Sequence, residues 1–184
     1  MLDAAIEVFA RKGYVETSVQ DIADAVGLLK GSLYHYIDSK EGLLYRLLNE
    51  VHDDVEAILA EVADFPGLGP LERLERYVER QVAYNLANLD RISVYYHDVH
   101  HLGDQRRQVI LGRRRVHERF VARLVAEAQV AGEADPTLDP VIATNCVFAT
   151  IIWVYRWYRP GRFDAEALAR DCARYAIEAL RAPA

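Results

Sequence analysis

The sequence predicts an all-α fold, and three observations support this. Apolar residues recur at spacings of three and four along most of the chain, which is the periodicity of helices that bury one face. Glycine and proline, 10 and 6 of 184 residues, are few and fall mostly between the periodic segments. No segment has the alternating polar and apolar pattern of a strand. We therefore expect about nine helices and no sheet.

The composition narrows the possible functions. A chain of 184 residues with 52% hydrophobic residues can bury a real core, either as one domain or as a small module joined to a larger one. Its net charge is -6, so it is not a general polyanion-binding protein. Any contact with nucleic acid must come from a local cluster of residues.

The first part of the chain is organised as three short helices. The first ends before Gly13, a typical helix terminator. Thr17 and Gln20 have the spacing of a capping box and start the second. A third fits within residues 29–36, and the short separation with Gly27 at its centre is typical of a helix-turn-helix unit.

Longer helices make up the rest of the chain. A second capping box, with Asp38 as the cap and Glu41 at the third position, starts a helix that runs from Lys40 to about Val62. Further helices are expected at residues 71–89, 91–101, 104–131 and 139–158, and after a cap at Asp164. We predict a helix-turn-helix domain at residues 1–45 and a larger helical domain for ligand binding and dimerisation at 46–184.

The stretch "GLLKGSLYHYIDSKEGLL", residues 27–44, concentrates cations and aromatic side chains in an acidic chain. A helix that reads the major groove presents such side chains on one face, and the start of the next helix can hold a phosphate. The residues predicted to contact DNA are Thr17, Ser18, Lys30, Gly31, Ser32, Tyr34, His35, Tyr36 and Lys40. The alternative is an ordinary capped helical hairpin with a solvated polar face.

Residues 2–48 resemble the DNA-binding domain of the tetracycline-repressor (TetR) family. The residues that carry the likeness are Ala5, Phe9, Gly13, Thr17, Ile22, Ala23, Gly27, Leu33, Tyr34, Tyr36, Lys40 and Leu43. The resemblance implies a cytoplasmic one-component transcriptional regulator, most often a repressor, which binds a palindromic operator as a homodimer and is released by a small effector. Family members usually carry a short basic arm before the first helix, and we expect weaker DNA binding without it.

The resemblance also implies that the last two helices pair two copies of the chain. The last helix has an apolar stripe with small residues that permit close approach: Leu168, Cys172, Tyr175, Ala176, Ala179 and Leu180. The alternative is that this stripe only closes the core of its own subunit.

The segment "IIWVYRWYRPGRF", residues 151–163, places arginines beside aromatic residues. This combination suits a ligand with an apolar body and a phosphate or carboxylate head. The segment resembles the branch of the family that responds to acyl-coenzyme A thioesters. The predicted ligand-binding residues are Tyr95, Tyr96, Arg106, Arg113, His117, Phe148, Ile152, Trp153, Arg156 and Trp157. Alternatively, the tryptophans belong to the core or dimer interface and the arginines to a solvated face.

Other functions find less support in the sequence. His97 and His101 have a spacing that can chelate a metal, with Asp98, His117 or another residue completing the set, so metal sensing is an alternative to an apolar effector. We assign no cofactor and no metal ligand beyond this alternative. The sequence lacks a phosphate loop, a nucleophile elbow and a zinc-protease motif, so we predict that the chain is not an enzyme.

The sequence also indicates where the protein acts. The two cysteines, Cys146 and Cys172, stand outside any metal or redox spacing and suit a reducing cytoplasm. We find no signal-peptide pattern and no apolar run long enough to span a membrane, so no membrane partner is expected.

Overall fold

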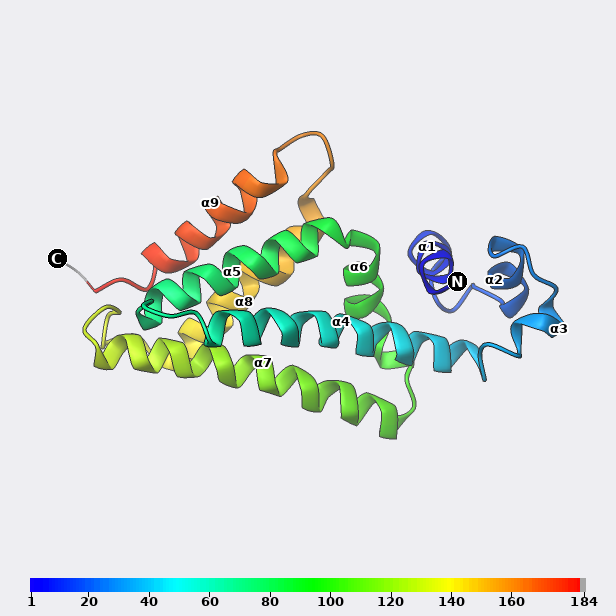
Figure 1. Ribbon diagram of the computed structural model, residues 1–184, viewed down its shortest axis with the longest axis horizontal. Helices are drawn as coiled ribbons and strands as arrows, with labels where there is room; N and C mark the ends of the chain where they lie inside the picture. The colour runs from blue at the N-terminus through cyan, green and yellow to red at the C-terminus, as the bar shows by residue number, and fades with distance from the viewer. Residues whose placement is uncertain (183–184) are drawn as a thin grey trace. The chain divides into compact units, whose positions relative to one another are not determined.

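The computed structural model describes residues 1–182, and its architecture confirms the predicted all-α class (Figure 1). Within that range it has nine α-helices and one short 3-10 helix, η1. Their bounds are α1 Leu2–Lys12, α2 Val19–Ala25, α3 Lys30–Leu33, α4 Lys40–Ala63, α5 Pro70–Ala87, α6 Leu89–Asp98, η1 Val99–His101, α7 Asp104–Val130, α8 Pro140–Trp157 and α9 Ala165–Glu178.

The helices form two compact units. Unit 1 contains residues 1–53 and 88–112, and unit 2 contains residues 54–87 and those from Arg113 onward. Helices α4 and α7 each contribute to both units. The functional boundary after residue 45 stays a prediction, and no pattern in the sequence indicates that segment 88–112 groups with the first helices.

Unit 1 is built on α1, α2, α3 and the first part of α4. Apolar side chains from all four helices are fully or almost fully buried, among them Phe9, Ile22, Leu33 and Leu44. A tight turn separates α2 from α3, in which Gly27 has a φ of +70°. Glycine adopts this left-handed backbone conformation without steric cost. The predicted helix-turn-helix connection is therefore present.

The cap of α2 differs from the prediction by one residue. Ser18, not Thr17, is the N-cap, and its hydroxyl accepts a hydrogen bond from the amide of Asp21 at 3.1 Å. The Asp21 carboxylate accepts from the Ser18 amide in return at 2.7 Å, so Asp21 replaces Gln20 in the capping box. The reason is that the Thr17 hydroxyl turns inward and donates to the Gly13 carbonyl at 2.7 Å.

The cap of α4 is also displaced by one residue. Helix α4 begins at Lys40, and the hydroxyl of Ser39 accepts from the amide of Gly42 at 2.9 Å. Ser39 therefore performs the role predicted for Asp38. The third helical position is then Gly42 rather than Glu41, which is free to bond elsewhere.

Unit 2 contains the rest of α4 with α5, α8, α9 and most of α7. Helix α5 contacts both α8 and α9 and buries one apolar stripe. Its Tyr77 is almost fully buried and meets Phe120 of α7 edge to face, with ring centroids 5.5 Å apart. Among residues 1–182 no helix has both the length and the apolar character that crossing a membrane requires.

Candidate nucleic-acid interface and effector region

Helix α3 and the turn after it carry most of the residues predicted to contact DNA. Helix α3 covers only residues 30–33, and the chain continues as a turn in which the Tyr36 amide donates to the Leu33 carbonyl at 2.9 Å. Leu33 is fully buried and anchors this segment to unit 1. All the predicted residues between Lys30 and Tyr36 are exposed except Ser32, which is half-buried. The segment thus offers cationic and aromatic side chains to a partner.

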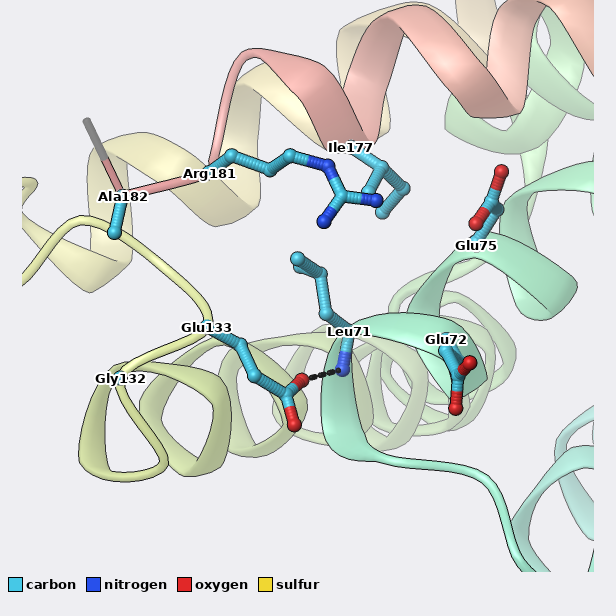
Figure 2. Close-up of a pocket in the computed structure, with 8 residues that line it drawn as sticks. All are labelled: Leu71, Glu72, Glu75, Gly132, Glu133, Ile177, Arg181 and Ala182. Atoms are coloured by element: carbon cyan, nitrogen blue, oxygen red, sulfur yellow. Dashed lines mark hydrogen bonds between the residues drawn. The ribbon is translucent and has the colours of Figure 1, made fainter. Parts of the chain in front are cut away.

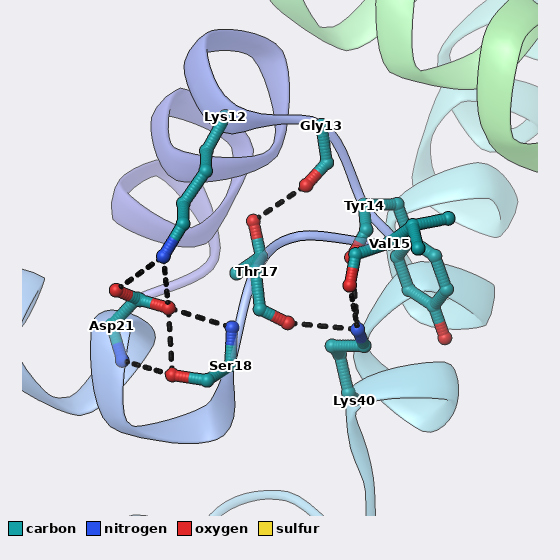
Figure 3. Close-up of polar contacts among 8 residues, drawn as sticks. All are labelled: Lys12, Gly13, Tyr14, Val15, Thr17, Ser18, Asp21 and Lys40. Carbon is teal, nitrogen blue, oxygen red and sulfur yellow. Dashed lines mark hydrogen bonds and ion pairs between the residues drawn. The ribbon is translucent and has the colours of Figure 1, made fainter.

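Thr17 and Ser18 have structural roles at the start of α2 (Figure 3). The Thr17 side chain is only 1% exposed and its hydroxyl is bonded to Gly13, which corrects its prediction as a DNA contact. Ser18 is exposed but its hydroxyl is engaged in the capping box. Asp21 also pairs with Lys12 at 2.8 Å. The Lys12 ammonium, together with the Ser18 hydroxyl and amide, holds the pKa of the Asp21 carboxyl below its usual range.

Lys40 closes the loop between α1 and α2 (Figure 3). Its ammonium donates to the carbonyls of Tyr14 at 2.8 Å, Thr17 at 2.7 Å and Val15 at 3.3 Å. It also lies 4.4 Å from the centroid of the Tyr14 ring. An ammonium has three donors, and all three are used here. The prediction of a phosphate contact by Lys40 therefore competes with a defined structural role.

The starts of α4 and α7 are joined within unit 1. One carboxylate oxygen of Glu41 accepts the amide of Gly103 at 3.1 Å and pairs with Arg106 at 3.4 Å. The Arg106 guanidinium also lies over the ring of Tyr45, 5.3 Å from its centroid. Arg106, predicted to bind the effector, is thus engaged in unit 1.

Tyr95 and Tyr96, also predicted to bind the effector, lie on α6 in unit 1. Tyr95 is buried, and its hydroxyl makes a 3.1 Å hydrogen bond with Nε2 of His52. The two tyrosine rings meet edge to face at 5.0 Å. Helix α6 also carries Arg91, which pairs with Glu50 of α4 at 3.4 Å. These contacts tie α6 to the unit 1 part of α4.

Arg113 and His117 are the predicted effector residues on the unit 2 part of α7. Arg113 makes a two-point ion pair with Glu56, with both nitrogen–oxygen distances 2.8 Å. His117 is buried, and burial lowers the pKa of its imidazole to about 4. The nearby Glu56 opposes this shift, and Arg113 and Arg114 add to it. His117 is therefore neutral at physiological pH.

The predicted effector residues on α8 do not share one environment. Phe148 and Ile152 are half-buried, whereas Trp153 is 61% exposed and Arg156 and Trp157 are exposed. The Arg156 guanidinium lies over the Trp153 ring, 5.6 Å from its centroid. This arrangement favours the alternative that the tryptophans serve an interface.

Two buried polar residues of α5 were missed from the sequence. Nε2 of Gln81 donates to Oδ1 of Asn85 at 3.0 Å, and Nδ2 of Asn85 donates to the Ile151 carbonyl of α8 at 2.9 Å. Oε1 of Gln81 is buried and has no hydrogen-bond partner in the part of the chain that the structure describes. The available signal was their position on the buried stripe of α5, where apolar residues are expected.

One pocket of unit 2, about 500 Å³ in volume, lies beside the start of α5 (Figure 2). Its lining residues are Leu71, Glu72, Glu75, Gly132, Glu133, Ile177, Arg181 and Ala182. Glu133 accepts the Leu71 amide at 2.9 Å, and Arg181 pairs with Glu178 at 2.7 Å. Among the charged residues of the lining, three glutamates outnumber the single arginine, so the pocket is unsuited to a ligand with a phosphate or carboxylate head.

The geometry gives no support to a metal site at His97 and His101. Helix α6 ends at Asp98 and the 3-10 helix η1 follows, so the two histidines do not share one α-helical face. His101 stacks on Tyr14, with ring centroids 5.1 Å apart. Within residues 1–182 neither histidine belongs to a group of three potential ligands with donor atoms close enough for one ion.

Comparisons with known proteins agree with the architecture. The family described as "Bacterial regulatory proteins, tetR family" matches residues 1–47. The family described as "Tetracyclin repressor-like, C-terminal domain" matches residues 67–180. The chain belongs to the tetracycline-repressor (TetR) family of transcriptional regulators, as the resemblance implied. Several relatives are named as repressors, and membership of a family of transcriptional regulators confirms the prediction that the chain is not an enzyme.

Individual relatives cover nearly the whole chain. The HTH-type transcriptional repressor KstR2 of Rhodococcus jostii is 31% identical and aligns with 100% of this chain and 90% of its own length. The structure of the ketosteroid transcriptional regulator KstR2 of Mycobacterium tuberculosis has a TM-score of 0.92 at 27% identity, over 99% of this chain and 93% of its own. AibR, in complex with isovaleryl coenzyme A and operator DNA, has a TM-score of 0.86 at 26% identity, over 100% and 97%.

Proposed function

We propose that this protein is a one-component repressor that binds a palindromic operator through α3 and is released by a small amphipathic effector. The exposed surface of residues 30–36 carries the proposal. Lys30, Tyr34 and His35 are exposed there, and no acidic residue lies between Gly27 and Ile37 in a chain of net charge -6. Such side chains suit phosphate and base-edge contacts in the major groove.

The repressor acts as a cytoplasmic homodimer in this proposal, paired through α8 and α9. Ile142 of α8 is 65% exposed, Trp153 is 61% exposed, and Tyr175 of α9 is 70% exposed. Large apolar side chains exposed on α8 and α9 favour a protein partner. A two-fold dimer would present two recognition helices to the two halves of a palindrome. Cys172 of the predicted α9 stripe is buried within its own subunit, whereas Tyr175 is exposed. In this proposal the stripe therefore contributes both to the core of its own subunit and to the dimer interface.

The effector in this proposal is an acyl-coenzyme A thioester. The structural neighbour AibR binds isovaleryl coenzyme A, and KstR2 is described as a ketosteroid regulator, so apolar metabolites are effectors consistent with these relatives. The aromatic and arginine residues of the chain suit an apolar body with an anionic head. An apolar effector without coenzyme A is the second candidate, and the buried polar pair Gln81 and Asn85 favours a ligand that carries a hydroxyl or carbonyl group.

Helix α4 links the two activities in this account. It is one continuous helix from Lys40 to Ala63, with its first part in unit 1 and its last part in unit 2. A ligand that favours one position of the helix over another changes the fit of the recognition helices to the operator. The ligand must bind the DNA-incompetent state more tightly, and a coupling of about 1–3 kcal/mol is typical.

Selection of operator sites followed by effector release tests the proposal. Purified protein is used to select binding sites from randomised DNA, and the enriched sequence should be palindromic. Thioesters of increasing acyl length, the matching free acids and steroid acids are then added to the complex. Release by thioesters supports the proposed effector, and release by free acids alone favours the second candidate. Enrichment of no sequence would contradict the DNA-binding function itself.

A further inference from the structure

We infer that Arg115 and Arg119 of α7 hold the phosphate groups of the effector, and that the apolar groove beside Arg119 receives its apolar part. The inference rests on the proposed function, because it places the proposed effector on particular residues of unit 2. Arg119 was not among the effector residues predicted from the sequence.

Two grooves of unit 2 meet at Arg119. The groove between α7 and α8 has a volume of about 310 Å³ and is lined by Arg115, Glu118, Arg119, Ala122, Val141, Thr144 and Asn145. The groove between α4 and α7 has a volume of about 490 Å³ and is lined by Leu59, Ala60, Ala63, Val116, Arg119, Phe120 and Arg123. A ligand with an anionic part and an apolar part can therefore occupy both grooves, and the junction between its two parts would lie beside Arg119.

The charges along α7 favour an anion at this place. Arg115, Arg119 and Arg123 are four residues apart and so lie on one side of the helix, where like charges repel. Arg123 has a partner in Glu127, 3.7 Å away. In the described part of the chain we find no ion pair to Arg115 or Arg119. A bound phosphate would remove this repulsion.

The acidic residue in the first groove does not cancel the positive charge. Glu118 pairs with Arg114 at 3.1 Å, so its charge is already balanced by a residue outside the groove. Arg115 and Arg119 are both exposed and can reach a ligand. A guanidinium offers parallel N–H donors that match two oxygens of a phosphate, which gives both affinity and orientation.

The second groove has the features of an apolar subsite. Phe120 and Leu59 form buried walls, and Val116 is 42% exposed on the same side of α7. Ala60 and Ala63 of α4 are small and leave room between the helices. A ligand wedged there would contact α4 directly, which is the helix that the proposed mechanism requires to move. The pocket at Glu133 has no residue of α4 in its lining and carries three glutamates.

Binding of free coenzyme A tests the anion site, because it carries the phosphates without an acyl chain. Calorimetric titrations compare the wild type with the double variant Arg115→Gln/Arg119→Gln. The matched control is Arg170→Gln, which removes one exposed arginine of unit 2 that lines neither groove. We expect at least tenfold weaker binding in the double variant and no change in the control. Arg115→Lys/Arg119→Lys should bind with intermediate affinity, because lysine keeps the charge without the fork.

Several results would overturn the inference. It is wrong if wild-type protein does not bind coenzyme A, or if the double glutamine variant binds it as tightly as the wild type. Should the glutamine variant fail to fold, the lysine variant and the salt dependence of wild-type binding decide the matter, because an arginine–phosphate site must weaken with salt. The double glutamine variant could lose coenzyme A binding and still be released from the operator by free acids. This result would contradict the proposed thioester effector but retain the anion site at Arg115 and Arg119. Thioester release that is unchanged in the double variant would leave the proposed function standing and refute the site.

Discussion

The ammonium of Lys40 donates a hydrogen bond to the carbonyl of Thr17 at 2.7 Å, which joins the first residue of α4 to the residue before the cap of α2. Two more carbonyls of the same loop occupy its other donors. A lysine that the sequence pattern assigns to the DNA backbone is therefore a link that positions the helix-turn-helix unit.

Replacing this lysine should destabilise the fold. In Lys40→Gln the loop carbonyls lose a charged donor, and the net contribution of a hydrogen bond to a charged group is about 1.5–3 kcal/mol, of which the glutamine amide can retain a part. We expect the free energy of unfolding in urea to fall by about 1–3 kcal/mol. The exposed Arg46→Gln, at the surface of the same helix, serves as control and should change it by less than about 0.5 kcal/mol. Equal effects of the two substitutions would contradict the role of Lys40.

The buried imidazole of His117 should make stability depend on pH. Burial lowers its folded-state pKa to about 4, whereas the unfolded value is about 6.5. Between these values the unfolded state binds more protons, so stability falls as the pH drops through this range and is constant above it. Each pKa unit corresponds to about 1.4 kcal/mol.

Urea unfolding at pH 7.5 and pH 4.5 measures this effect. The loss of stability on acidification should be smaller in His117→Gln than in the wild type. His35→Gln, in which an exposed histidine is replaced, should retain the wild-type pH dependence. If His117→Gln and the wild type lose the same stability, the imidazole is not the responsible group.

Glu133 should stabilise the start of α5. Its carboxylate accepts the Leu71 amide at 2.9 Å, an amide in the first turn that has no partner inside the helix (Figure 2). Removing such a cap costs about 0.5–2 kcal/mol, so Glu133→Ala should lower the melting temperature by several degrees. Glu127→Ala, which removes an exposed carboxylate of α7 paired with Arg123, should have a smaller effect. The reverse order would refute the capping role.

The exposed apolar residues of α8 should hold the proposed dimer together. Ile142→Asp and Trp153→Asp place a charge where the partner would be packed, so sedimentation should change from a dimer to a monomer. Val130 provides a matched control, because it is 91% exposed and lies at the end of α7. Val130→Asp should remain dimeric. A monomeric wild type, or dissociation caused equally by the control, would contradict the interface.

The helices and the helix-turn-helix connection could be predicted because they depend on local patterns. The apolar periodicity, the turn at Gly27 and the Asp164 cap each depend only on residues that are close together in the sequence. The caps of α2 and α4 each lie one residue from the predicted position. The reason is that the adjacent residues Thr17 and Ser18, and likewise Asp38 and Ser39, are all of types that cap helices. Which of the two serves depends on where the other side chain turns, as the buried Thr17 shows.

The effector residues could not be placed by sequence because they depend on how distant segments pack. Tyr95 and Arg106 contact the first part of α4, and the sequence does not indicate that segment 88–112 joins unit 1. The aromatic residues around Trp153 have a composition that suits a pocket as well as an interface. Gln81 and Asn85 were missed because polar residues on a buried stripe oppose the pattern that defines it.

The most direct measurement is the affinity of the double variant Lys30→Ala/Tyr34→Ala for the selected operator. Fluorescence anisotropy measures this affinity over a range of salt concentrations. Both side chains are exposed at α3 and have no structural contact among those described, so the variant should keep the wild-type melting temperature. We predict at least tenfold weaker binding and a salt dependence lowered by about one phosphate contact, with Arg170→Ala unchanged. Wild-type affinity in the folded double variant would contradict the claim that α3 reads the operator.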